Sequence, residues 1–197
     1  MTWLLPLEPD AFQVTLQTLV PSLLETFGAA MPERLQRLAR RLADNGAWYM
    51  HRRAGPPRTI VHGNFRLDNL LFETSGEGVT LTIIDWQVPF VGLGVVDIAY
   101  FAASCLHQEQ RRAIERPMIG IYHATLLANG VHGYTLDRCW EDYRFATLTA
   151  LARLITSGAL LDFSSERGQG TVSGCHRSDG RYPGRPQRRR SSARPGG

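Results

Sequence analysis

Two motifs decide how this chain is interpreted: HGNFRLDN at residues 62–69 and TIIDW at residues 82–86. Between them, two short apolar runs flank the turn sequence SGEG at residues 75–78. Apolar runs on either side of a glycine-containing turn predict a β-hairpin. Such a hairpin would bring Asn69, which precedes its first strand, close to Asp85, which ends its second.

The length and composition suit a single domain with a packed core. The chain has 197 residues, of which 43% are hydrophobic. It has no apolar run of about 18 residues, so we expect no transmembrane helix. The first ten residues lack a basic segment and soon become acidic, which argues against a signal peptide. Cys105, Cys139 and Cys175 are far apart in the sequence, which favours reduced thiols in a cytoplasmic protein.

The positive charge is concentrated at the C-terminal end. All 22 basic residues are arginine. Residues 164–197 carry eight of them against two acids, whereas residues 1–163 carry 14 against 16 acids. The body therefore gives no sign of a nucleic-acid surface, and nucleic-acid binding would depend on the basic tail.

The tail at residues 164–197 is rich in Arg, Gly, Ser and Pro and has few apolar residues. We expect it to be disordered, because it buries too little surface to offset the ordering entropy. One interpretation is a functional basic arm. The other is a shifted reading frame, because the absence of lysine suggests GC-rich DNA, in which a shifted frame encodes mainly these residues.

Apolar spacing predicts a mainly helical body. Pro21 should kink or divide the first helix, and Asp97 should N-cap the third. A short buried strand is expected at residues 59–61, and residues 52–57 are expected to form a connector. The expected helices span 9–28, the segment from Pro32, 98–106, 108–128 and the segment from Asp137.

Periodicity also predicts which side chains face inward. In the helix at 108–128 these are Ile114, Met118, Ile121, Tyr122 and Leu126. In the last helix they are Trp140, Tyr143, Leu148, Leu151, Leu154 and Ile155. Trp86 is expected in the core.

The two motifs resemble the catalytic and metal-binding segments of the aminoglycoside phosphotransferase and choline kinase-like family. The family pattern is His-Gly-Asp, four residues and Asn, followed by Ile-Asp-Trp. Residues 62–69 and 84–86 match it with one exception, at Asn64. The resemblance implies a protein-kinase-like fold of the α+β class, mainly α-helical, with residues 1–163 forming the C-terminal lobe. It also implies ATP-dependent phosphorylation of a small-molecule alcohol.

The resemblance assigns Asn69 and Asp85 as Mg²⁺ ligands. Mg²⁺ prefers oxygen ligands and takes the rest of its coordination sphere from phosphates and water. Asn64 occupies the position of the catalytic Asp, which accepts the proton of the acceptor hydroxyl. An amide has no usable basicity, and losing a base typically removes a factor of roughly 10² to 10⁴ in rate. Asp68 is the other carboxylate in the loop, but the family does not use that position as the base.

Three further residues have supporting roles in this resemblance. His62 is expected to pack under the loop. Arg66 could contact phosphate or substrate, with a surface salt bridge as the alternative. Asp97 resembles the buried Asp that ties the catalytic loop to a following helix.

A kinase-like enzyme also needs an N-terminal lobe with a phosphate-covering loop and a Lys that pairs with phosphates. The chain contains no Lys, and no five-stranded pattern precedes the loop, so we expect the N-terminal lobe to be absent, with ATP binding in doubt. Three interpretations follow: a truncated phosphotransferase with little activity, a non-catalytic pseudokinase-like binding module, and a nucleic-acid-binding protein acting through its tail.

Overall fold

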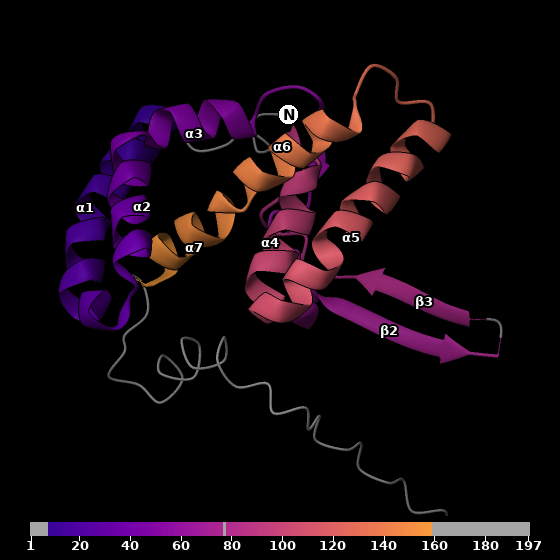
Figure 1. The fold of residues 1–197 in the computed structure, drawn as a ribbon, viewed down its shortest axis with the longest axis horizontal. Coiled ribbons are helices and arrows are strands. Elements are labelled where there is room, and N and C mark those ends of the chain that lie inside the picture. The colour runs from indigo at the N-terminus through magenta and orange to yellow at the C-terminus, as the bar shows by residue number, and fades with distance from the viewer. Residues whose placement is uncertain (1–7, 77, 159–197) are drawn as a thin grey trace, which may run out of the picture. The chain divides into compact units, whose positions relative to one another are not determined.

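The computed structural model describes residues 8–76 and 78–158, and the predictions for residues 1–7 and 164–197 lie outside them (Figure 1). Helices dominate this part of the chain. Its elements in order are α1 (Pro9–Phe27), η2 (Gly28–Ala30), α2 (Glu33–Asp44), α3 (Gly46–Arg53), β1 (Arg58–Val61), η3 (Leu67–Asn69), β2 (Leu70–Ser75), β3 (Gly78–Ile83), β4 (Phe90–Leu93), α4 (Val95–Cys105), α5 (Gln108–Ala128), α6 (Leu136–Ala146) and α7 (Leu148–Gly158).

The buried side chains form two clusters. The first joins α1, α2, α3 and α7 around fully buried residues such as Leu16 and Tyr49. The second joins β1, β4, α4, α5 and α6 around residues such as Val96 and Ile119. Phe145, at the end of α6, packs against both clusters and links them.

Helix α1 is continuous through Pro21, so of the two predicted outcomes, a kink or a division, the division was wrong. Proline removes one backbone hydrogen bond from a helix. Pro21 is exposed, so water can bond the carbonyl group that is left without a partner.

Helix α3 replaces the first part of the connector that was expected at residues 52–57. Its beginning depends on contacts with α1, because the N–H of Ala47 donates to the Gln13 side chain at 3.1 Å. A Cβ on Gly46 would lie 2.7 Å from the Cα of Gln13, so glycine permits this close approach.

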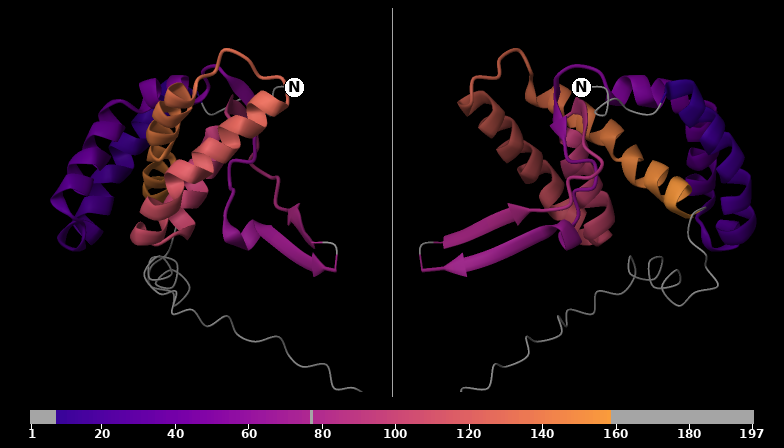
Figure 2. Two further views of the ribbon diagram at one scale, coloured as in Figure 1. Left: turned by 45° about the vertical axis from the view of Figure 1, so that its right-hand side comes forward. Right: turned by 180° about the vertical axis from the view of Figure 1, so that it is seen from behind.

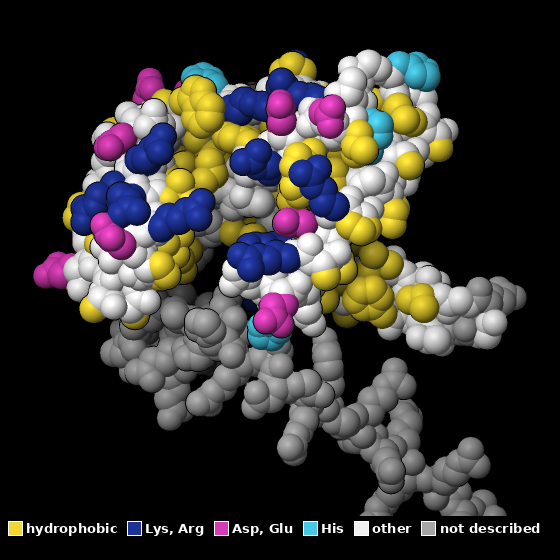
Figure 3. All heavy atoms as spheres, viewed as in Figure 1, with side chains coloured by type: hydrophobic (Ala, Val, Ile, Leu, Met, Phe, Trp, Pro, Cys, Tyr) yellow, Lys and Arg dark blue, Asp and Glu magenta, His cyan; other side chains and the backbone are white. Residues whose placement is uncertain are grey.

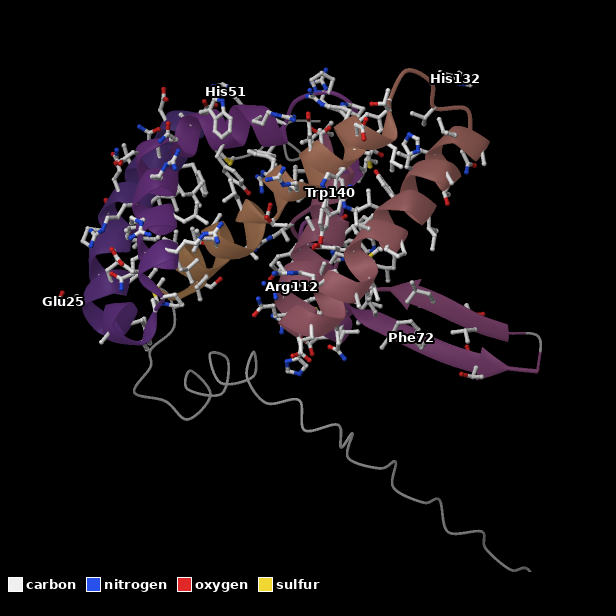
Figure 4. All side chains as sticks on the ribbon, in the orientation of Figure 1. Glu25, His51, Phe72, Arg112, His132 and Trp140 are labelled. Atoms are coloured by element: carbon white, nitrogen blue, oxygen red, sulfur yellow. The ribbon has the colours of Figure 1, made fainter. Side chains whose placement is uncertain are left out.

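Helix α5 has the predicted bounds, but its predicted inner face is partly wrong. Ile119 is its buried residue, whereas Ile114 is 42% and Ile121 71% exposed. Trp140 on α6, labelled in Figure 4, receives the guanidinium of Arg116 from α5 over its ring at 3.7 Å. The long α5 is therefore covered by neighbours on only part of its circumference.

The single helix expected from Asp137 is two helices, α6 and α7, that meet at Thr147. Helix α6 packs on α4 and α5, and α7 packs on α1, α4 and α2. The buried hydrophobic residues of α6 belong to the second core cluster, and those of α7 to the first. Leu154, expected inside, is 40% exposed.

The four strands form two antiparallel pairs. Strand β1 pairs with β4, a strand that the sequence did not predict, in a register that sets Val61 opposite Phe90. Of the residues in β1, Val61 is buried and Ile60 is 62% exposed, so the expectation of a buried strand at residues 59–61 was wrong for its first part.

Strands β2 and β3 form the predicted hairpin, in which Leu70 faces Ile83. The hairpin extends away from the helices in both views of Figure 2. Figure 3 shows hydrophobic side chains on the surface of the hairpin. Phe72 and Leu81, on β2 and β3, are 59% and 45% exposed. None of the described helices is long and apolar enough to cross a membrane.

Candidate active site

The base of the β2–β3 hairpin brings the two motifs together. The pairing of Leu70 with Ile83 continues beyond the strands, because the N–H of Ile84 donates to the carbonyl of Asn69 at 3.0 Å. The next residue, Asp85, therefore lies beside Asn69. The Nδ2 group of Asn69 is 3.4 Å from Oδ2 of Asp85.

Asn64 joins the same group of side chains. Its Nδ2 donates to Oδ2 of Asp85 at 3.2 Å, and its carbonyl accepts from Nδ2 of Asn69 at 2.8 Å. One carboxylate oxygen of Asp85 thus accepts from two amides that come from different ends of the loop.

Two residues of the site have backbone angles in the left-handed region. Gly63 has a φ of 79°, and a Cβ there would lie 2.4 Å from the carbonyl oxygen of Val88. Asp85 has a φ of 66°, which is uncommon for a residue with a side chain and costs about 1–2 kcal/mol. Such strain is characteristic of functional sites, and here it turns the Asp85 carboxylate toward the loop.

His62 uses both ring nitrogens inside the protein. Its Nε2 donates to the carbonyl of Ile84 at 2.8 Å, and its Nδ1 accepts from the N–H of Asn64 at 3.2 Å. The side chain is 1% exposed. His62 therefore has no ring nitrogen left over for a proton from a substrate.

Asp97 lies within the first turn of α4, whose N-cap is Gly94, so the prediction that Asp97 caps this helix was wrong. Its carboxylate instead accepts from two consecutive N–H groups of the loop, His62 at 2.7 Å and Gly63 at 3.0 Å. Burial raises the pKa of Asp97, although these two N–H donors, His62 and Arg153 act to lower it.

The Arg66 side chain forms an ion pair with Asp68 at 2.5 Å, and both residues are exposed. Burial acts to lower the pKa of Arg66, but the Asp68 carboxylate together with Tyr100 and Cys105 raises it more, so the net shift is upward. This ion pair is the surface alternative that the sequence left open for Arg66.

Arg153 is a residue of the site that the sequence did not reveal. It lies on α7, 90 residues from Gly63, and donates to the carbonyl of Gly63. No motif surrounds Arg153, so its proximity to the loop follows only from the packing of α7.

The predicted core position of Trp86 was also wrong: its ring packs edge-on against His62 at 4.6 Å, yet it is 50% exposed.

The residues around Asp85 suit a metal ion that takes few ligands from the protein and most of them from phosphates and water. No three His, Cys, Asp or Glu side chains gather as a metal-binding cluster in residues 8–76 and 78–158. Asp85 offers a carboxylate and Asn69 an amide oxygen. Mg²⁺ is often bound by one or two protein groups together with phosphates and water, so this pair fits it.

The chain was compared with known proteins and solved structures. The family model of the ecdysteroid kinase-like family matches residues 8–131. Two curated proteins match shorter segments: a probable acyl-CoA dehydrogenase of Arabidopsis thaliana is 43% identical over 53 residues, and acyl-CoA dehydrogenase family member 10 of Mus musculus is 46% identical over 48 residues. These segments are 27% and 24% of the chain but 6% and 4% of the relatives. No solved structure matches.

The family match covers the whole stretch from His62 to Asp97 and more than half of the chain. It does not confirm the narrower resemblance to aminoglycoside phosphotransferases. It does agree with a mainly helical α+β fold and with kinase-like chemistry. The chain therefore belongs to the ecdysteroid kinase-like family, a kinase-like family related to choline kinase and the aminoglycoside phosphotransferases.

Proposed function

We propose that this chain is a phosphotransferase that moves the γ-phosphoryl group of ATP to a hydroxyl of a small molecule, with Mg²⁺ as its metal. The convergence of Asn64 and Asn69 on the strained Asp85 is the observation that carries this proposal. Phosphoryl transfer depends mainly on positioning and on neutralising phosphate charge. A rigid loop with a metal-binding carboxylate at its centre suits that task.

In this proposal Asp85 and Asn69 hold the metal. Asn69 now directs Nδ2 toward Asp85. A half-turn of its amide would break its hydrogen bond to the carbonyl of Asn64 and present Oδ1 instead, giving two oxygen ligands at the base of the hairpin. The bound metal would neutralise charge on the transferred phosphate, while the ties from Asp97 and Arg153 hold the backbone of the loop in place.

Asn64 limits the rate in this proposal. Its amide cannot accept the proton of an acceptor hydroxyl, and its Nδ2 already donates to Asp85. It can still orient a hydroxyl through Oδ1. We therefore expect slow transfer that a carboxylate at position 64 would accelerate by a factor of roughly 10² to 10⁴.

A second candidate function is that of a non-catalytic binding module. The contact between Asn64 and Asp85 favours it, because this contact replaces the repulsion that two carboxylates would have there. In this alternative the site binds its small molecule or protein partner and transfers nothing.

Metal and nucleotide binding distinguish the two functions. Mn²⁺ can replace Mg²⁺ and be counted by electron paramagnetic resonance in the presence of ATP. We expect the wild-type chain to bind Mn²⁺ with ATP and Asp85→Asn to bind it at least about tenfold more weakly, since disturbing even an outer-shell partner commonly costs that much. Asp68→Asn is the matched control, because Asp68 is an exposed carboxylate in the same loop.

Turnover is measured in parallel as Mg²⁺-dependent release of ADP with a panel of alcohols. Faster turnover in Asn64→Asp that disappears in Asn64→Asp/Asp85→Asn supports the phosphotransferase. Absence of both Mn²⁺-ATP binding and turnover, even in Asn64→Asp, would reject it and leave the binding module.

A further inference from the structure

A cavity of about 640 Å³ lies next to the loop. Its walls come from α1, α3, α7 and the segment that follows Asp85, elements that are shown in Figure 1. This volume is within the range of small-molecule sites. Trp86 and Arg153 line the cavity and also contact the loop, through the ring of His62 and the carbonyl of Gly63. A molecule in this cavity would therefore lie beside the residues proposed for phosphoryl transfer.

The cavity contains two guanidinium groups, those of Arg53 and Arg153. Within residues 8–76 and 78–158, neither forms an ion pair with a carboxylate. Arg52, the residue before Arg53, differs from it, because Arg52 forms an ion pair with the buried Asp142. Arg153 still interacts electrostatically with the Asp97 carboxylate, whose pKa it acts to lower, and donates to the carbonyl of Gly63. Among the described residues, neither cavity arginine therefore has a directly paired carboxylate like the one that Arg52 has.

Aromatic rings hold Arg53 in position. Its Cζ lies 4.1 Å from the ring centroid of Phe90 and 5.7 Å from that of Tyr49. Burial lowers the pKa of Arg53 and the charge of Arg153 lowers it further, whereas the neighbouring Tyr49 acts to raise it. A bound anion would offset the two effects that disfavour the charged form.

Apart from Gln87, the rest of the wall is mostly apolar. Phe12, Met50 and Phe90 contribute apolar surface, and the hydroxyls of Tyr49 and Thr149 bond to each other at 2.9 Å. A ligand that fits this wall has an apolar body. The fixed, planar fork of an arginine suits a carboxylate, phosphate or sulfonate group.

We propose that this cavity binds the acceptor through an anionic group held by Arg53 and Arg153, so that the acceptor class is an organic anion with an apolar body and a hydroxyl. This inference rests on the proposed function for the hydroxyl, but the anion site itself can be tested without ATP or metal. Arg53 determines specificity, and Arg153 both binds the anion and positions the loop.

Binding is measured by isothermal titration calorimetry with three probes that share one aromatic body: 1-naphthaleneacetate, 1-naphthyl phosphate and the neutral 1-naphthalenemethanol. We expect the better of the two anions to bind at least about tenfold more tightly than the neutral alcohol, since a tenfold ratio needs only about 1.4 kcal/mol. The order of the two anions identifies the anionic group as carboxylate or phosphate.

Arg53→Gln should remove the preference for the anion and leave the affinity for the alcohol unchanged. Arg53→Lys keeps the charge and should retain part of the preference. Arg112→Gln, at the exposed position on α5 labelled in Figure 4, is the matched control and should bind all three probes as the wild type does. Circular dichroism of each variant checks that it is folded. If Arg53→Gln does not fold, Arg53→Lys is used in its place.

Equal affinity for the anions and the alcohol, or a preference that survives Arg53→Gln, would overturn the anion site. If the protein shows no preference for the anions but still phosphorylates neutral alcohols, the proposed function stands and only the anion site is rejected. If the anions bind as expected and no transfer occurs, the anion site stands and the phosphotransferase fails.

Discussion

Asp97 and Asp142 both place a carboxylate within the helical body, but they bind different partners. Asp97 is partly buried and accepts from the backbone N–H groups of His62 and Gly63. Asp142 is 0% exposed and accepts from Arg52, Arg138 and the hydroxyl of Tyr134. One carboxylate positions a loop, and the other joins α3 to α6.

The difference explains why the two residues should respond differently to substitution. Removing the charge of the buried Asp142 leaves the partly buried guanidinium of Arg52 without its carboxylate, and losing one partner of such a pair is costly. Removing Asp97 leaves two N–H groups without an acceptor, and the effect concentrates on the loop. Substitutions at four carboxylates or their partners test this distinction.

The largest effect is expected for Asp142→Asn. The variant keeps the shape of the side chain but loses the charge that compensates Arg52. We expect the free energy of unfolding to fall by about 3–5 kcal/mol, measured by urea denaturation at pH 7. Asp137→Asn, an exposed position on the same helix, is the control. A loss below about 1 kcal/mol, the upper end for exposed ion pairs, would show that Asp142 does not join the helices.

Asp97→Asn should cost less and act locally. Asparagine keeps one acceptor oxygen but turns an N–H donor toward one of the two loop N–H groups. We expect a loss of about 1–3 kcal/mol and faster hydrogen exchange at the amides of His62 and Gly63. Unchanged exchange at these two amides would contradict the role of Asp97 in holding the loop.

The same variant has a pH signature. Because burial raises the pKa of Asp97, the folded state binds this proton more tightly than the unfolded state does. The contribution of Asp97 to stability is therefore greatest below the ordinary Asp pKa of about 3.9 and decreases as pH rises through the raised value. The stability of the wild type relative to Asp97→Asn should fall accordingly between acidic and neutral pH.

Tyr143→Phe tests a carboxylate whose partner is a neutral hydroxyl. The hydroxyl of Tyr143 donates to Glu115 on α5 at 3.2 Å. Burial, followed by the Glu115 carboxylate, raises the pKa of Tyr143 to about 12. At pH 7 we expect the variant to be less stable by about 1 kcal/mol, the usual net contribution of a hydrogen bond.

This difference should shrink at alkaline pH. An unfolded tyrosine ionises near pH 10, whereas folded Tyr143 stays protonated up to about pH 12. The free energy of unfolding of the wild type therefore decreases between about pH 10 and pH 12. Tyr143→Phe has no hydroxyl at this position and lacks this decrease. Urea denaturation between pH 9 and 12 measures both curves, and parallel curves would refute the assignment.

The smallest effect is expected for Asp68→Asn. Asp68 pairs with Arg66, and both side chains are exposed. Exposed ion pairs contribute little, so we expect a change within about 0.5 kcal/mol, detectable only at low salt. A larger loss of stability that persists in 1 M NaCl, where the Debye length is about 3 Å, would show that the Arg66–Asp68 pair contributes as a buried ion pair such as that of Asp142 does.

Much of the local structure could be predicted from the sequence. The hairpin and the bounds of α5 follow from apolar spacing and turn residues, which act over short distances. Helix α3 was missed because its first N–H groups depend on Gln13 of α1. The break between α6 and α7 was missed because it is a single residue, Thr147, which keeps helical backbone angles and is not a helix breaker such as Gly or Pro.

The sequence by itself indicated a kinase-like family, though not which one, and it determined the hairpin and the proximity of Asn69 to Asp85, because the register of one short hairpin is enough to set that distance. It also determined that the base position holds Asn64. Only the tertiary structure brought Arg153 to Gly63 and placed it with Arg53 in one cavity. Those contacts join residues about 90 positions apart, and no local pattern encodes them, since they arise from the packing of α7 between α1 and α4.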